Sequence, residues 1–256
     1  MRLTVLGCCG SGPGPDSPAS GYLVQEDGFA LGLDLGNGAF GAMQRHLDPF
    51  RLGALALSHL HPDHCADVSA LVVYLRYHPD GKPGRPPIPL FGPAESAARL
   101  AAAYAPSLAE LAEADLSDVL EFRRLGPLTV HIGPLRLTAV PAAHPCEAYS
   151  LRVEGEGGTL VYTGDSGPCE PLDELAAGAD LLLAEATWTH DESRPPDLHL
   201  SGVQAGELAT RAGVGRLLLT HVAPWTKPAE VIEEARQTFD GPVEVVTADS
   251  VYDVAG

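Results

Sequence analysis

A dense cluster of metal-binding side chains stands in the sequence His-Leu-His-Pro-Asp-His, which begins at His59. Neutral imidazole and carboxylate groups are the ligands that suit Zn²⁺, Mn²⁺ or iron. In extended backbone, residues two apart point the same way, so His59 and His61 can bind one ion together. The proline then interrupts regular structure, and Asp63 and His64 can open a helix that faces a second ion. Chance clustering of polar residues in a loop is the alternative, and the density of ligands argues against it.

Three further candidate ligands follow apolar, strand-like runs far along the chain. Asp165 follows the run TLVYTG, His221 follows RLLLT, and His144 lies just beyond LTAVPAA. Sites in α/β proteins gather at the carboxyl ends of strands, so these positions can form one site with the early cluster. Taken alone, each is better explained as a loop histidine, a turn aspartate or a strand-end histidine. Together they supply the partners that the early cluster lacks.

The elements that position these residues are predicted from hydrophobic periodicity. Apolar runs rich in branched residues predict strands at 2–7, 20–26, 29–34, 54–58, 128–132, 135–141, 148–154, 159–163, 180–184, 216–220 and 243–247. Helical patterns occur at 38–47, 66–76, 93–104, 107–115, 170–177, 202–212 and 228–238. Ser201 is suited to cap the helix that follows it. Strand–helix units recur throughout, which is typical of an α/β protein whose sheets are covered by helices.

The ligand pattern and several longer segments resemble the metallo-β-lactamase-fold hydrolases, and within them the ribonuclease Z-like branch. The likeness to that branch lies in TVLGCCGSGPGPDSPASGYLV, LGLDLGNG, YTGDSG and HLSGVQAGELATRAGVGRLLLTH. Other segments most resemble actinobacterial atypical class II cyclic-nucleotide phosphodiesterases: GPDSPASGYL, SHLHPDHCAD, RYHP, EATWTH, PPDLHLSG and LLLTHVAPWT. The resemblance covers nearly the whole chain. It implies one domain over 1–256 with a four-layer αββα fold, in which two mixed sheets are sandwiched between helices.

The resemblance also implies a role for each candidate ligand. Seven residues are expected to hold two divalent ions, which are Zn²⁺ in the first instance, with Mn²⁺ or iron as alternatives. The first ion takes three imidazoles, from His59, His61 and His144. The second ion takes one carboxylate and two imidazoles, from Asp63, His64 and His221. The ligand shared by both ions is Asp165.

Four side chains are expected to serve the chemistry at this site or to support its ligands. Asp63 and His199 are the catalytic candidates, and the resemblance implies that His199 protonates the leaving oxygen or stabilises the transition state. The alternative for His199 is a solvent-exposed histidine before a helix. Asp34 and Asp67 are candidates to orient ligand imidazoles from behind. Alternatively, Asp34 shapes a glycine-flanked turn and Asp67 is a solvated helix charge.

The composition limits the substrate class. The chain has 34 acidic and 16 basic side chains, with a formal net charge of −18. A protein that grips a long phosphate backbone normally presents a basic face, so a small phosphodiester is expected and nucleic acid less so. No apolar run approaches the roughly 18 residues of a membrane span, and the N-terminus lacks a signal segment. We therefore expect a cytoplasmic protein without a membrane partner. The resemblance adds a homodimer as the expected assembly.

The resemblance, together with these observations, implies a metal-dependent phosphoric diester hydrolase that converts 3′,5′-cyclic nucleotides such as cAMP to nucleoside monophosphates. Tyr77, Trp188 and Trp225 are candidate walls for the base, although each is equally suited to packing. The first alternative is tRNA 3′-end processing by a ribonuclease Z, but the interval from His144 to His199 leaves no room for a tRNA-binding arm. A thioesterase with the same ligands is the second alternative. A metal-stabilised sensor without turnover is the third.

Overall fold

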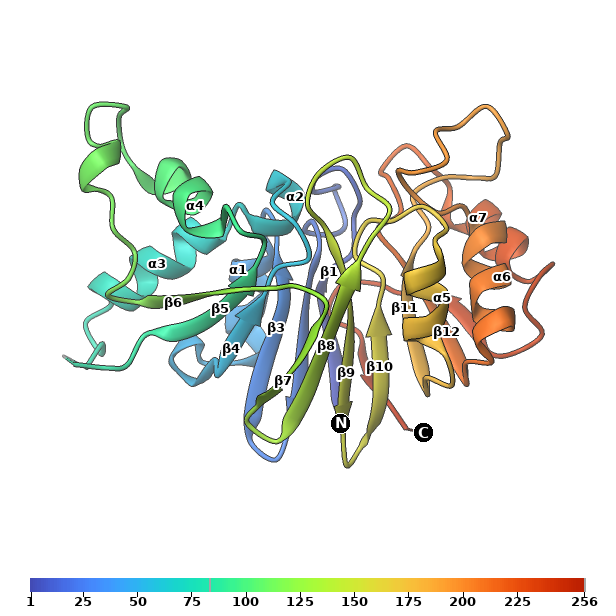
Figure 1. The fold of residues 1–256 in the computed structure, drawn as a ribbon, viewed down its shortest axis with the longest axis horizontal. Helices are drawn as coiled ribbons and strands as arrows, with labels where there is room; N and C mark the ends of the chain where they lie inside the picture. Colours follow the sequence, from blue (N-terminus) through green and yellow to red (C-terminus); the bar gives the residue numbers. More distant parts are fainter. Residues whose placement is uncertain (83, 256) are drawn as a thin grey trace.

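The computed structural model describes residues 1–82 and 84–255, which form two packed β-sheets with helices on both outer faces (Figure 1). The described part of the first sheet contains, in spatial order, β14 (Val251–Asp253), β1 (Arg2–Gly7), β2 (Gly21–Glu26), β3 (Phe29–Leu35), β4 (Ala54–Ala56), β5 (Ile88–Gly92) and β6 (Leu120–Arg124). The second contains β13 (Val243–Val245), β12 (Arg216–Thr220), β11 (Leu181–Glu185), β10 (Gly158–Tyr162), β9 (Tyr149–Gly155), β8 (Leu135–Pro141) and β7 (Leu128–Ile132).

Both sheets are mixed, and they are built alike. Three antiparallel pairings join β14, β1, β2 and β3, and three parallel pairings continue through β4, β5 and β6. The second sheet likewise pairs β7 to β10 antiparallel and β10 to β13 parallel. The parallel halves need crossover connections, and helices supply most of them.

Helices complete the outer layers. The first sheet is covered by α1 (Ala39–His46), α3 (Val68–Tyr77) and α4 (Ser96–Tyr104), and the second by α5 (Glu170–Ala176), α6 (Gly202–Ala212) and α7 (Pro228–Ala235) (Figure 1). One apolar core lies between the sheets, and one more lies between each sheet and its helices. The four-layer αββα metallo-β-lactamase fold expected from the sequence is therefore confirmed.

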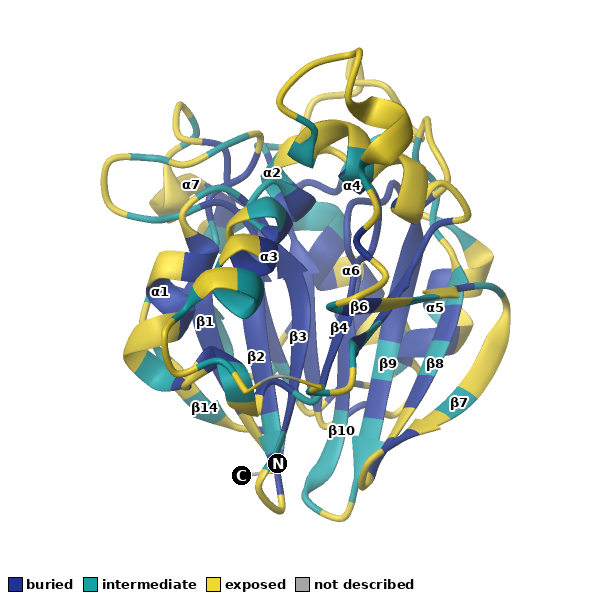
Figure 2. Ribbon diagram, turned by 90° about the vertical axis from the view of Figure 1, so that its left-hand side faces the viewer, coloured by how far each residue is buried: buried dark blue, intermediate teal, exposed yellow. Residues whose placement is uncertain are grey.

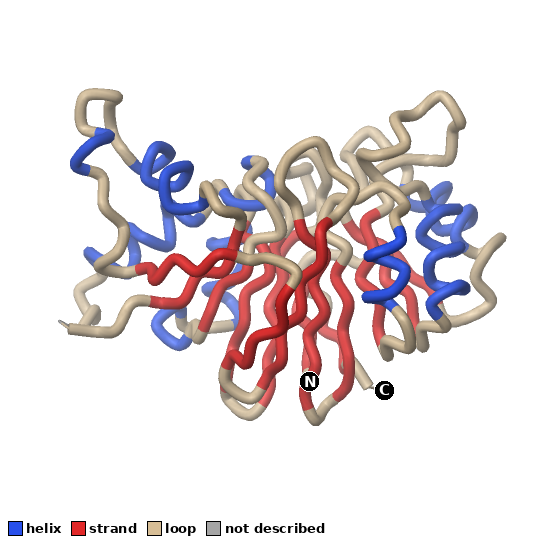
Figure 3. The backbone as a smooth tube through the Cα atoms, viewed as in Figure 1, coloured by secondary structure: helices blue, strands red, loops and turns tan. Residues whose placement is uncertain are grey.

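Burial explains why several strands are apolar along their whole length. The strand β11 reads LLLAE and is buried at every position, because the core between the sheets lies on one side of it and helix packing on the other. Figure 2 shows the buried strands at the centre and the exposed residues on the outer helices and loops. The longer loops collect along one edge of the two sheets, whereas the termini lie at the opposite edge (Figures 1 and 3).

The structure corrects the predicted elements in two ways. The strands β5, β6 and β14 were not predicted; β5 contains Pro89, and proline is rare inside strands. The helix predicted at 107–115 is wrong, because this segment forms turns and a short 3₁₀ helix at Leu111–Glu113. Its leucines Leu108 and Leu111 are exposed, so the segment has no apolar surface on which a helix could pack.

Among the residues that the structure describes, none of the helices combines the length and the apolar character needed to cross a membrane.

Candidate metal centre

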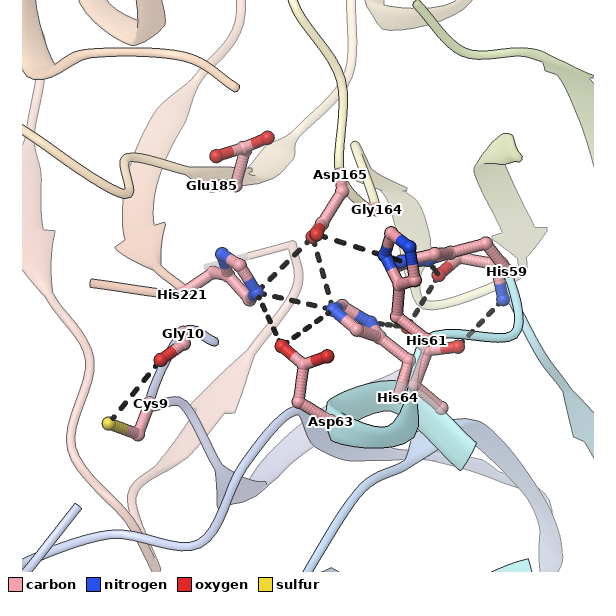
Figure 4. A network of polar contacts seen from close by, with 12 residues as sticks. Cys9, Gly10, His59, His61, Asp63, His64, Gly164, Asp165, Glu185 and His221 are labelled. Carbon is pink, nitrogen blue, oxygen red and sulfur yellow. Dashed lines mark hydrogen bonds and ion pairs between the residues drawn. The ribbon is translucent and has the colours of Figure 1, made fainter. Parts of the chain in front are cut away.

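The seven predicted ligands converge at the loop-rich edge of the two sheets. His59 follows β4, His144 lies between β8 and β9, Asp165 follows β10, and His221 follows β12. The short helix α2 (Pro62–Cys65) carries Asp63 and His64, and His61 directly precedes it (Figure 4). Segments that lie more than 150 positions apart in the sequence therefore meet in one place, as the strand-end positions predict.

The first cluster consists of His59, His61 and His144. The Nδ1 atom of His61 lies 2.9 Å from Nε2 of His59 and 3.2 Å from Nε2 of His144. His59 is fully buried, whereas His61 is exposed. Three imidazole nitrogens from two separate loops therefore point at a common position that solvent can reach from one side.

The second cluster consists of Asp63, His64 and His221. The Nε2 atoms of the two imidazoles lie 3.2 Å apart. The Oδ2 atom of Asp63 lies 3.3 Å from Nε2 of His221 and 3.6 Å from Nε2 of His64. Both imidazoles are buried. The proline at the first position of α2 suits a helix start, and it fixes where Asp63 and His64 project.

Asp165 lies between the two clusters and faces both of them. Its Oδ2 atom is 3.7 Å from Nε2 of His59. Its Oδ1 atom is 3.1 Å from Nε2 of His64 and 3.3 Å from Nε2 of His221. This Oδ1 atom is buried, and among the described residues it has no partner with hydrogen-bond geometry. A buried carboxylate oxygen without a hydrogen bond is costly, and a cation beside it would offset that cost.

The spacing of the donor atoms fits divalent metal ions. Nitrogen ligands bind Zn²⁺ at about 2.0–2.1 Å, which places neighbouring nitrogens of a tetrahedral site roughly 3.3 Å apart. The imidazole nitrogens within each cluster lie 2.9–3.2 Å apart, close to that value. The ligand atoms in each cluster also lie within 4.8 Å of one another. The residues present therefore fit a divalent metal centre.

The backbone around the site adopts conformations that are uncommon for side chains with a Cβ atom. Asp34 and His221 have φ angles of 56° and 55°. Such positions cost free energy and persist where the surrounding structure holds them, often at functional sites. A Cβ atom on Gly10 would lie 2.2 Å from the carbonyl oxygen of His221, so glycine is required beside this ligand.

Asp34 supports the second cluster from behind. Its Oδ2 atom lies 2.8 Å from Nδ1 of His64, the nitrogen that faces away from the cluster. The same carboxylate accepts hydrogen bonds from the Ser58 backbone N–H, the Ser58 hydroxyl and the Tyr162 hydroxyl, at 2.6–2.8 Å. An aspartate with these partners acts as an acceptor, so it favours a proton on Nδ1 and a lone pair on Nε2 of His64.

Asp67, the other candidate for an orienting role, lies elsewhere. Its Oδ2 atom accepts a hydrogen bond of 2.9 Å from the backbone N–H of Phe40, in the first turn of α1. No hydrogen bond or ion pair joins it to a ligand imidazole among the described residues. The expectation that Asp67 orients a ligand was therefore wrong. Its carboxylate instead satisfies an N–H group that the start of a helix leaves unpaired.

The pKa shifts of the ionisable side chains at the site indicate that it favours a cation. Burial tends to raise the pKa of Asp165, but the imidazoles of His221 and His64 outweigh it and hold that pKa well below its usual value. Burial tends to lower the pKa of His64, yet Asp165 and Asp34 raise it well above its usual value. Burial, with His64 next in importance, lowers the pKa of His59. The carboxylates thus favour positive charge at the point where the imidazoles converge.

His199 lies beside both clusters, next to a carboxylate that the sequence analysis missed. Its Nδ1 atom is 3.0 Å from Oε1 of the fully buried Glu185, at the end of β11. Burial lowers the pKa of His199, but Glu185 outweighs burial and raises it. Its ring centre lies 5.6 Å from that of His144 and 5.5 Å from that of His221. The signal for Glu185 was present, since this acid follows an apolar strand as the predicted ligands do.

The three aromatic residues proposed as walls for the base differ in their position relative to the site. Trp188 packs edge-on against His199, with ring centres 4.9 Å apart, so it borders the site. Trp225 is 76% exposed. Tyr77 lies on α3 with its hydroxyl 3.5 Å from that of Tyr104 on α4. Trp188 is therefore the candidate that the geometry places in contact with a proposed functional residue.

Comparison with known proteins agrees with this geometry. A model of the β-lactamase superfamily domain matches residues 33–222. The chain is 48% identical over 257 residues to an uncharacterised protein of Mycobacterium leprae. The aligned region covers 99% of this chain and 89% of that protein. The chain is 30% identical to ribonuclease Z of Mycolicibacterium gilvum, with coverage of 96% and 93%.

A solved structure extends the comparison to the fold. The crystal structure of the metallo-β-lactamase-fold protein YhfI from Bacillus subtilis superimposes with a TM-score of 0.86 at 26% identity, and it covers 98% of both chains. The family match, the homology to ribonuclease Z and the convergent His/Asp clusters are mutually consistent. The chain therefore belongs to the β-lactamase superfamily, and it is a metallo-hydrolase of that superfamily with homology to ribonuclease Z.

Proposed function

We propose that this chain is a binuclear metal-dependent phosphodiesterase whose substrates are 3′,5′-cyclic nucleotides, cAMP among them. The observation that carries the proposal is the position of Asp165, whose two oxygens face different clusters. A carboxylate shared in this way suits a pair of ions, and paired ions are common in enzymes that cleave phosphate esters. Two divalent ions would lower the pKa of water to give a nucleophile near neutral pH and would offset charge on the phosphoryl oxygens.

The proposed ligand sets follow the two clusters. The first ion would be held by His59, His61 and His144, and the second by Asp63, His64 and His221, with Asp165 shared. Imidazole and carboxylate ligands suit Zn²⁺ best among the common candidates, and Mn²⁺ and iron accept the same donors.

His199 is the proposed proton donor. Its Nδ1 atom faces the acceptor Glu185, and its ring borders both clusters. When the P–O bond of the cyclic ester breaks, the departing alkoxide needs a proton, which the outer nitrogen of a protonated His199 can donate. Water supplies the new P–O bond, and solvent returns a proton to the imidazole. Glu185 supports this role because its proximity raises the pKa of His199.

The segment before His199 favours a small substrate over tRNA. All residues from 145 to 198 are described, and they form β9, β10, α5 and β11 with connecting loops. This stretch contains two basic side chains besides histidine, Arg152 and Arg194. Arg152 donates to backbone carbonyls, and Arg194 lies over the Trp188 ring. A tRNA-binding arm would need a larger, more basic insertion in this interval.

The test is a substrate panel with purified protein loaded with Zn²⁺ or Mn²⁺. The panel comprises 3′,5′-cAMP, 3′,5′-cGMP, 2′,3′-cAMP, bis(p-nitrophenyl) phosphate, a glutathione thioester and a 3′-extended tRNA. We expect the highest kcat/KM for a 3′,5′-cyclic nucleotide, with a nucleoside monophosphate as the product. The Asp63→Ala variant is the control for contaminating activity.

The other outcomes identify the alternatives. Hydrolysis of the thioester or the tRNA without turnover of cyclic nucleotides would replace the proposed substrate class. Stoichiometric metal binding with no hydrolysis of any substrate would instead indicate a sensor.

A further inference from the structure

The buried carboxylate of Glu185 contacts more than the proposed proton donor. Its Oε1 atom accepts a hydrogen bond of 2.8 Å from the Ser166 backbone N–H and lies 3.0 Å from Nδ1 of His199. Its Oε2 atom accepts a hydrogen bond of 2.7 Å from the Thr187 hydroxyl. Thr187 and Glu185 are 2% and 0% exposed, so these contacts are shielded from water.

The hydroxyl of Thr187 has a second partner, and this contact reaches the second cluster. Its oxygen lies 2.8 Å from Nδ1 of His221, the nitrogen that faces away from Asp63 and Asp165. A hydroxyl has one proton, and the Glu185 carboxylate is its acceptor. The hydroxyl oxygen must therefore accept from His221, which requires a proton on Nδ1 and leaves the lone pair on Nε2.

We propose that Thr187 is a positioning residue that fixes the tautomer of His221 and transmits the charge of Glu185 to it. This inference rests on the proposed metal centre. One buried carboxylate then supports two histidines with different roles, since it acts on His199 directly and on His221 through the Thr187 hydroxyl. His64 lies in the same cluster and contacts its own carboxylate, Asp34, without an intermediate.

The side chain of Thr187 has the reach that this role requires. A hydroxyl is short enough to bridge a carboxylate and an imidazole, and a carboxylate in contact with His221 would add a charge to a fully buried position. A valine would keep the branched shape but leave Nδ1 of His221 without an acceptor. The serine variant keeps the hydroxyl and loses only a methyl group.

The experiment compares Thr187→Val with Thr187→Ser. Isothermal titration with Zn²⁺ and metal analysis measure the affinity and stoichiometry of each ion, and kcat is measured separately. We expect Thr187→Val to lower the affinity for one of the two ions about 10- to 100-fold. This magnitude is typical of losing an outer hydrogen-bond partner of a metal ligand. Thr187→Ser should stay within a few-fold of wild type. Equal metal affinity in the valine variant would overturn the proposal.

A double-mutant comparison separates this role from simple packing. Glu185→Gln in the wild-type background should lower the affinity for the ion at the second cluster and also lower kcat, because Glu185 is proposed to act on both His221 and His199. In the Thr187→Val background, Glu185→Gln should still lower kcat but should no longer change metal affinity. An unchanged effect on affinity in that background would show that Glu185 does not act through Thr187.

A measurement on the unmodified protein covers the case in which Thr187→Val does not fold. Nitrogen-15 NMR of the Zn²⁺-loaded wild type reports which imidazole nitrogen of His221 carries the proton, and we expect Nδ1. A proton on Nε2 would overturn the proposal. If the wild type binds no metal at all, the proposed function fails first. If it binds two ions and hydrolyses substrate while the valine variant behaves identically, only the role of Thr187 fails.

Discussion

Both histidine clusters turn imidazole nitrogens inward, but they differ in what lies behind the imidazoles. Behind the first cluster the direct partners are neutral oxygens, although the Ser58 hydroxyl in turn donates to Asp34. The Nδ1 atom of His59 lies 3.1 Å from the Ser58 hydroxyl, and Nδ1 of His144 lies 3.0 Å from the carbonyl oxygen of Leu198.

Behind the second cluster one of the two imidazoles contacts a buried carboxylate directly. His64 contacts Asp34 at 2.8 Å, and His221 reaches Glu185 through a hydroxyl. Both imidazoles of this cluster are buried, whereas the first cluster includes the exposed His61.

This difference leads us to expect different metal affinities at the two clusters. A neutral acceptor fixes the tautomer of an imidazole, whereas a carboxylate also increases its basicity and hence its strength as a ligand. We therefore expect the second cluster to hold its ion more tightly. The first cluster includes the exposed His61, and its imidazoles contact carboxylates behind them only through the Ser58 hydroxyl. It is therefore expected to exchange its ion more readily and to face the substrate.

The largest expected effect is that of Asp63→Ala. Among the described residues, Asp63 is the one carboxylate that belongs to the second cluster alone, so metal content should fall from two ions to one. Turnover should fall about 10³-fold or more, because a metal ion contributes several kcal/mol of charge stabilisation in the transition state. Circular dichroism should show the fold retained.

The matched variant for this comparison is His61→Ala in the first cluster. This variant should lose the more weakly bound ion and keep the more tightly bound one. If His61→Ala abolishes the tight binding step while Asp63→Ala leaves it intact, the proposed order of affinities is reversed.

The next largest effect is that of His199→Ala, which should lower kcat about 10²-fold, the lower end of the range for general acid catalysis. Metal content should stay at two ions, because His199 is proposed to donate a proton and not to bind metal. His190→Ala is a control from the same loop; its Nδ1 atom contacts Ser201 instead of the clusters. Loss of metal in His199→Ala would show that this residue is a ligand and not the proton donor.

A smaller effect is expected from Asp34→Asn, which keeps the size of the side chain and removes its charge. The affinity for the ion at the second cluster should fall about 10- to 100-fold, since His64 loses its carboxylate partner. Asp67→Asn is the matched control, because Asp67 bonds the N–H of Phe40 and its amide replacement retains an acceptor. Equal losses in the two variants would mean that the charge acts through overall electrostatics and not through the contact with His64.

The convergence of the seven candidate ligands could be predicted because much of its signal is local. Four of them lie within six consecutive residues, and His144, Asp165 and His221 each follow an apolar run that ends at the same edge of the fold. A strand-end position is a one-dimensional property, so periodicity and spacing are enough to find it. The α/β class followed from the same patterns, whereas the four-layer arrangement followed from the family resemblance.

The supporting residues could not be predicted in the same way, because their roles depend on contacts across the fold. Asp34 and Asp67 are both acidic residues near the site, yet only Asp34 faces an imidazole. The connection from Glu185 through Thr187 to His221 joins two adjacent strand ends, and nothing in the spacing marks its direction. The helix expected at 107–115 failed for a related reason: helical propensity was present but a packing surface was not.

The smallest effect, and the finest test of the comparison, is that of Tyr162→Phe. The Tyr162 hydroxyl donates to Oδ2 of Asp34 from the opposite sheet, at 2.8 Å. Its loss leaves the other contacts of Asp34 in place, so stability should fall by about 1 kcal/mol and affinity for the second ion by a few-fold at most. Chemical denaturation and zinc titration measure these changes.

Tyr149→Phe deletes a comparable hydroxyl, one that donates to the exposed Glu147. It should change metal affinity less than Tyr162→Phe does, because its partner does not contact a ligand of the second cluster. If the two variants change zinc affinity equally, the carboxylate support of the second cluster does not extend to the opposite sheet. The advantage of that cluster would then come from burial and from the direct contact between Asp34 and His64.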